Sequence, residues 1–261
     1  MPRTKIHPRT LSWLGLALAS ATGTACVGGS APSDPYALPG ETPEAVTTAG
    51  SSGVGQPPPA AGSRQSHFPL VDGATWVYQH TNLVDDPWDE TATMTATTYN
   101  DADAVVLADE EDAKGEQTRS TLVVDGTRVY RAYKETAVDG VVAVSTSYDP
   151  AFLRYDEAWT QPGVSVTLDD DWTQTCVVAS VASNCAPGAV KIGITSHSYK
   201  VLDVAAQVSV PAGDFTAVKI QRDNVLDPET KLFWFAAGVG KVREENPETG
   251  AVEALSRYEI P

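Results

Sequence analysis

The stretch Leu122-Val123-Val124-Asp125-Gly126-Thr127-Arg128-Val129-Tyr130 decides the fold class of this 261-residue chain. Two runs rich in β-branched residues flank an Asp-Gly dipeptide, and glycine accepts the positive φ angle that tight hairpin turns require. A second dipeptide of this kind, Asp139-Gly140, separates two valine-rich runs. Strands joined by such short turns must run antiparallel, so the pattern predicts a meander of hairpins.

The hairpin pattern continues toward the C-terminus. The segment Val210-Pro211-Ala212-Gly213-Asp214 predicts a three-residue hairpin loop, and two more turns are predicted at 227–230 and 246–250. Residues of the last strand alternate: one side carries Val252, Ala254, Ser256, Tyr258 and Ile260, and the other carries Glu253, Arg257 and Glu259, with Leu255 as an apolar exception. We expect the first side to be buried and the second to face solvent.

One segment has helical rather than strand spacing. Asp149-Pro150 is typical of a helix start, Phe152, Tyr155 and Trp159 follow at helical intervals, and Gln161-Pro162-Gly163 is typical of a stop. Residues 67–261 are therefore predicted to form one mainly all-β domain, a curved antiparallel meander, sandwich-like or otherwise covered on its apolar face, with one short helix.

The first residues have the organisation of a secretion signal. Basic residues at positions 3, 5 and 9 precede an apolar run from Leu11 to Ala21, and Gly23-Thr24-Ala25-Cys26 follows. The run is about half the roughly 20 residues that a membrane-spanning helix needs. Residues 1–25 are therefore predicted to be a signal peptide that is removed.

A cysteine directly after small residues resembles the bacterial lipoprotein box, and this resemblance implies that the thiol of Cys26 is lipidated and becomes the new N-terminus. The alternative is an ordinary signal cut after Ala21 or Ala25. Residues 26–66 are dominated by Gly, Ser, Ala, Thr and Pro, so they cannot bury enough apolar surface to order themselves. We expect a disordered tether between lipid and domain.

Composition limits the partners. Thirty-four Asp and Glu residues against 18 Lys and Arg give a net charge of −16, so the surface would repel a nucleic-acid backbone. The acidic runs 85–90, 109–112 and 169–171 lack the alternating ligands and the glycine of a calcium loop, so they are interpreted as solvated turns and no metal site is predicted.

Two cysteines remain once Cys26 is assigned to lipid. Cys176 and Cys185 lie nine positions apart and are expected to form a disulfide in an oxidising compartment. A metal site built on the two thiolates would need further Cys or His ligands at a suitable spacing, and the sequence offers none.

No residues have the spacing of a catalytic motif, so neither catalysis nor a cofactor is predicted. A triad assembled from distant residues stays open, because such sites are built in space rather than in sequence. Aromatic side chains are the best candidates for contact with a ligand or partner: Trp76, Tyr78, Trp88 and Trp234. For Trp76 and Trp234 a core position is the favoured alternative, whereas Trp88, in Asp-Asp-Pro-Trp-Asp, is the favoured exposed contact.

Two blocks resemble a known group. Phe68-Pro69-Leu70-Val71-Asp72-Gly73-Ala74-Thr75-Trp76-Val77-Tyr78 resembles the F-P-L-x-x-G-x-x-W-x-Y opening of uncharacterised bacterial lipoproteins. The segments 210–219 and 233–242 resemble their V-P-A-G-x-F and W-F-A-x-G-V-G-x-V strands. The resemblance implies an open half-barrel similar to the lipoprotein carriers LolA and LolB, with the short helix in its mouth, and it implies no activity.

Together these patterns predict a non-enzymatic, lipid-anchored envelope protein whose β domain binds an apolar ligand or a protein partner. Val27 lacks the acidic side chain associated with retention in the inner membrane, which favours the outer membrane. The alternatives are a structural or assembly component of the envelope, and a hydrolase whose site sequence does not reveal.

Overall fold

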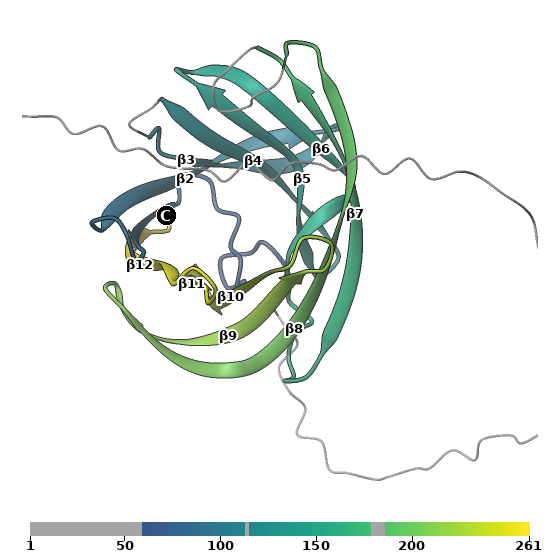
Figure 1. Cartoon of the computed structure of the whole chain (residues 1–261). Helices are drawn as coiled ribbons and strands as arrows, with labels where there is room; N and C mark the ends of the chain where they lie inside the picture. The colour runs from purple at the N-terminus through teal and green to yellow at the C-terminus, as the bar shows by residue number, and fades with distance from the viewer. Residues whose placement is uncertain (1–58, 113–114, 179–185) are drawn as a thin grey trace, which may run out of the picture. The chain divides into compact units, whose positions relative to one another are not determined.

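The structure, a computed structural model, describes residues 59–112, 115–178 and 186–261. These residues form twelve strands that close into one antiparallel barrel (Figure 1). The strands are β1 (Thr75–Thr81), β2 (Trp88–Tyr99), β3 (Ala102–Asp109), β4 (Glu116–Asp125), β5 (Arg128–Val138), β6 (Val141–Asp156), β7 (Ser165–Cys176), β8 (Val190–Val210), β9 (Gly213–Asn224), β10 (Glu229–Ala236), β11 (Gly240–Asn246) and β12 (Ala251–Glu259). Each strand pairs with its neighbours in sequence, which confirms the predicted all-β antiparallel meander.

The expected open half-barrel or sandwich-like sheet is wrong, because the sheet has no free edge among the described strands. β1 pairs with β12 from Thr75 opposite Glu259 to Thr81 opposite Val252. This pairing satisfies backbone groups that an open edge would leave exposed. The first and last strands are far apart in sequence, and no local pattern in either strand predicts that they pair.

The predicted turns fall where the strands change direction. Asp139 and Gly140 have φ angles of 50° and 76° between Val138 and Val141, which pair directly. Positive φ at both loop residues is the geometry of the turn that Asp-Gly favours. The loop after β8 is shorter than predicted: Val210 pairs with Gly213, so only two residues are unpaired.

The predicted helix at 149–163 is absent from the described residues, and most of that segment is the second half of β6. Phe152, Leu153 and Tyr155 lie opposite Arg131, Tyr130 and Val129 of β5. Aromatic residues favour strands wherever a partner strand is present, so tertiary pairing overrides the helical spacing here. Trp159 follows in a turn, where its ring contacts Tyr155 and Tyr199.

The faces predicted for β12 hold only in part. Leu255 is completely buried and Glu253 lines the interior cavity, whereas Arg257 and Glu259 are exposed as expected. The β1–β12 register shifts between Val77 and Tyr78. Because an extra residue reverses which side chains point inward, simple alternation along the whole strand does not identify the buried face.

The ordered domain begins before the predicted boundary at residue 67. Residues 59–66 form turns, and the buried Ser66 accepts a 2.9 Å hydrogen bond from the Gly238 amide through its carbonyl oxygen. Figure 1 shows this N-terminal stretch inside the ring of strands. The predicted signal peptide, Cys26 and most of the tether lie outside the described residues.

The aromatic core fills one part of the barrel interior. Tyr155 and Phe235 are 4.9 Å apart between ring centroids, and Phe68 contacts Phe235 at 5.8 Å. No helix in the described ranges is long and apolar enough to cross a membrane.

Candidate functional site

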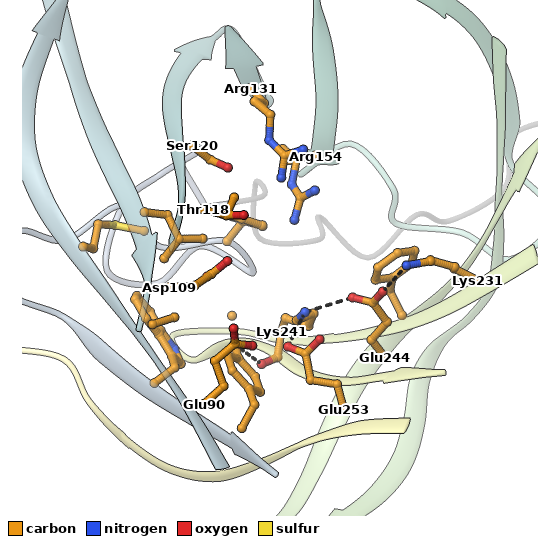
Figure 2. A pocket seen from close by; sticks show the side chains of 18 of the residues that line it. Glu90, Asp109, Thr118, Ser120, Arg131, Arg154, Lys231, Lys241, Glu244 and Glu253 are labelled. Atoms are coloured by element: carbon orange, nitrogen blue, oxygen red, sulfur yellow. Dashed lines mark hydrogen bonds and ion pairs between the residues drawn. The ribbon is translucent and has the colours of Figure 1, made fainter. Parts of the chain in front are cut away.

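A cavity of about 320 Å³ occupies the part of the barrel interior that the core leaves unfilled (Figure 2). A barrel of eight strands is just wide enough for side chains to fill or for one small ligand, so twelve strands leave more room. The cavity is lined by Phe68, Pro69, Trp76, Tyr78, Glu90, Ala92, Met94, Leu107, Asp109, Thr118, Ser120, Arg131, Phe152, Arg154, Arg222, Lys231, Phe233, Gly240, Lys241, Glu244 and Glu253.

One part of the wall is apolar. Trp76 and Met94 come from β1 and β2, Leu107 comes from β3, and Phe68 comes from the N-terminal segment. The Trp76 indole Nε1 donates a 2.7 Å hydrogen bond to the Val239 carbonyl oxygen, which holds the ring in place. This surface can contact the apolar body of a ligand without leaving a buried polar group unpaired.

A second part of the wall is a network of ion pairs centred on Lys241. Its Nζ lies 2.9 Å from Glu244 and 2.6 Å from Glu253, and Lys231 lies 3.0 Å from Glu244 (Figure 2). Burial alone would raise the pKa of Glu244, but Lys241 and Lys231 outweigh it and lower that pKa below its usual range. Burial would likewise lower the pKa of Lys241, yet the neighbouring carboxylates raise it. These side chains are therefore charged and already paired.

The carboxylate of Asp109 also faces the cavity. It forms no ion pair with the described residues, whereas Glu90 lies 2.8 Å from His80. Burial, and then the charge of Glu90, raises the pKa of Asp109 to about 6. A carboxyl group held in an environment that disfavours its charge is typical of functional sites.

The remaining charged residues of the cavity are three arginines, Arg131, Arg154 and Arg222, from β5, β6 and β9. Figure 2 shows Arg131 and Arg154 reaching in across the cavity from Lys241. The guanidinium groups lie against aromatic rings: Arg131 and Arg222 are 5.7 and 5.6 Å from the Phe152 centroid. Arg154 is 6.0 Å from that of Phe68.

Within the described ranges none of these arginines has a carboxylate partner. The Nε of Arg131 is buried and has no hydrogen-bond partner among the described residues. Burial, and then the charges of Arg131 and Arg222, lowers the pKa of Arg154 to about 9. The cations repel one another, and their contacts with aromatic rings offset part of this cost, as does the charge of Glu244 for Arg154.

The N-terminal segment that carries Phe68 is held by a buried carboxylate. Glu157 accepts hydrogen bonds from the Ser66 hydroxyl at 2.5 Å and the His67 amide at 2.9 Å, and it lies 2.8 Å from His67 Nδ1. We call Ser66, His67 and Glu157 the N-terminal clasp. The hydroxyl of Ser66 bonds the carboxylate rather than the imidazole, so the three do not form a nucleophile and base pair.

A smaller hollow of about 210 Å³ adjoins the cavity and shares Lys231, Glu244 and Glu253 with it. Its other side is formed by His80 and Trp88, whose rings stack 5.0 Å apart. Trp88 is 43 % exposed, and this predicted contact residue lies beside the cavity rather than in it.

The structure separates the four predicted contact residues. Trp76 and Tyr78 line the cavity, Trp88 lines the adjoining hollow, and Trp234 lines neither. The Trp234 ring is instead covered by its cross-strand neighbours Lys219 and Arg243, at 4.6 and 5.7 Å.

The two cysteines of the predicted disulfide are not both described. Cys176 is buried at the end of β7, and Cys185 lies outside the described residues, so the pairing stays a prediction. Groups of three or more residues that could hold a metal ion are absent from the described ranges.

Sequence reasoning missed the charged wall of the cavity. In the last strand the charged residues, Glu253 among them, were expected on the solvent side. The pairings of His80 with Glu90 and of His67 with Glu157 have no motif spacing. The signal that was present is the density of charged residues in 241–245, where Lys241, Arg243, Glu244 and Glu245 crowd one strand. In comparisons with known proteins, no family model, no curated protein and no solved structure matches the chain.

Proposed function

We propose that this chain is a non-enzymatic binding protein of the cell envelope, anchored by lipid on Cys26, whose barrel interior holds a small amphipathic molecule. The observation that carries the proposal is the cavity of about 320 Å³, which has an apolar wall facing a charged one. This volume is near the lower end of ordinary ligand pockets, which suits a compact ligand rather than a long lipid chain.

The electrostatics of the cavity support this proposal. Burial raises the pKa of Asp109 and lowers the pKa of Arg154, and both shifts favour the neutral form of the side chain. Groups of this kind lower the stability of the folded state, and an apolar interior would avoid the cost. Their presence in one cavity is the pattern expected where binding, rather than packing, determines the residues.

Envelope location rests on the N-terminal sequence. The leader, the small residues before Cys26 and the low-complexity tether support export and lipidation. Mass spectrometry of the protein purified from membranes should find a lipidated N-terminal Cys26, and an unmodified thiol there would contradict the anchor.

Binding can be tested by titrating a neutral fluorophore, N-phenyl-1-naphthylamine, into the purified protein. We expect saturable enhancement of its fluorescence. Thr118→Trp should abolish the signal, because Thr118 lines the cavity and the larger ring would fill it. Thr121→Trp is the matched control, since Thr121 lies on the same strand and does not line the cavity.

Either of two results would contradict the proposal. One is no saturable signal with folded, unmodified protein. The other is equal loss of the signal in the two tryptophan variants, which would place the fluorophore outside the barrel. The alternatives, a structural component of the envelope and a hydrolase, have no specific observation in their favour.

A further inference from the structure

Arg131, Arg154 and Arg222 are the cations of the cavity wall that have no ion-pair partner among the described residues. Glu244 and Glu253 are paired with Lys241, and Glu90 is within 2.8 Å of His80. The arginines instead lie against the faces of Phe68, Phe152 and Phe233. These cations therefore remain available to a ligand, whereas most of the carboxylates of the cavity are already paired.

The balance of charge inside the cavity is opposite to that of the chain. The lining contains five Lys and Arg residues against four Asp and Glu residues. The whole chain carries a net charge of −16. A positive region has thus been concentrated in the interior of an acidic protein, where water screens charges poorly.

The geometry of the arginine side chain narrows the chemical class of the ligand further. A guanidinium group presents its N–H donors in a planar fork that matches the two oxygens of a carboxylate, and the aromatic contacts orient that plane. The buried Nε of Arg131 is a donor without an acceptor among the described residues. An acceptor supplied by a ligand would remove this cost.

We propose that Arg131, Arg154 and Arg222 form an anion subsite that binds the carboxylate of a small organic acid, while its apolar body contacts Trp76, Met94 and Leu107. This inference rests on the proposed function and adds the chemical class of the ligand. The arginines come from β5, β6 and β9, so the barrel brings side chains from strands that are not all neighbours into one cavity.

The test compares three probes that share one apolar body: 4-phenylbutanoate, its methyl ester and 4-phenylbutylamine. Each is titrated into the unmodified full chain by calorimetry and by displacement of N-phenyl-1-naphthylamine. We expect the acid to bind about tenfold or more tightly than the ester, since hydrogen bonds to a charged group are the strong ones. The amine should bind most weakly, because the subsite would repel it.

Variants then locate the effect. Arg131→Gln and Arg154→Gln should each weaken binding of the acid about tenfold and leave the affinity for the ester and the fluorophore within twofold. Arg257→Gln is the matched control, because Arg257 is exposed on β12 and does not line the cavity. Arg154→Lys should recover only part of the affinity, since lysine keeps the charge and loses the planar fork.

The outcomes separate the two proposals. If the fluorophore binds and the acid binds no more tightly than the ester, the anion subsite is refuted and the binding cavity stands. Equal weakening of acid and ester by Arg154→Gln also refutes the subsite. If no probe binds to folded protein, the binding function itself fails. The comparison of acid with ester uses protein without substitutions, so it tests the anion subsite even if a variant does not fold.

Discussion

Asp109 offers the most direct test of the electrostatics inside the barrel. In the folded protein its pKa is raised from 3.8 to about 6, chiefly by burial. One pKa unit corresponds to about 1.4 kcal/mol, so ionising Asp109 in the folded state costs roughly 3 kcal/mol of stability. Replacing Asp109 with asparagine removes the charge and keeps the shape of the side chain.

The sign of the effect follows from proton binding. Between about pH 4 and pH 6 the folded state holds the proton of Asp109 more tightly than the unfolded state, so unfolding becomes easier as the pH rises. Below this window both states are protonated, and above it the cost is constant. Asp109→Asn should therefore stabilise the protein by about 2 to 3 kcal/mol at pH 8 and by much less at pH 4.

Urea unfolding followed by tryptophan fluorescence at the two pH values measures this difference. Urea is preferred because it is uncharged and does not screen the interior charges. For a domain of this size the gain corresponds to roughly 4 to 12 °C in Tm at pH 8. The matched control is Asp103→Asn, an exposed position on the same strand, which should change neither value appreciably.

Two results would contradict this effect of Asp109: no stabilisation by Asp109→Asn at pH 8, or the same gain in stability at both pH values. In the first case the carboxylate is not disfavoured by its surroundings. In the second case the gain comes from something other than the lost charge.

Three further predictions concern stability. Glu157→Ala should lower the free energy of unfolding by about 3 kcal/mol, because it leaves the buried donors of the N-terminal clasp without an acceptor; an unchanged melting curve would contradict this role. Gly193→Ala should cost about 1 to 3 kcal/mol and shift the tryptophan emission, because a Cβ there would overlap the ring of Trp172. Lys241→Met should cost about 3 kcal/mol in urea unfolding at pH 7, since it removes the main partner of the buried Glu244, and a loss below 1 kcal/mol would show that Lys231 suffices.

Local chemistry in the sequence was enough to predict the strands and turns near each hairpin. Asp139-Gly140 adopts positive φ at both residues because these two residue types tolerate that conformation, and nothing distant is required. The helix predicted at 149–163 fails for the opposite reason. Phe152 and Tyr155 have helical spacing, but β5 supplies a strand partner for both, and pairing outweighs spacing.

The candidate site was predictable only in part. Trp76 and Tyr78 were predicted as contact residues, and both line the cavity. Glu253 was assigned to solvent because a charged residue usually faces water. A wide barrel interior accommodates such a residue when a partner such as Lys241 lies within reach, so charge alone does not distinguish the inside from the outside.

Turn geometry and side-chain alternation act between neighbouring residues, so the antiparallel order of the strands could be predicted from the sequence. The closure of the sheet, the faces that point inward and the grouping of Arg131, Arg154 and Arg222 in one cavity are known from the three-dimensional structure. These features depend on contacts between strands far apart in the chain, such as β1 with β12. Shifts in register between strands set which side chains face the interior, and a residue's nearest neighbours in sequence carry no information about them.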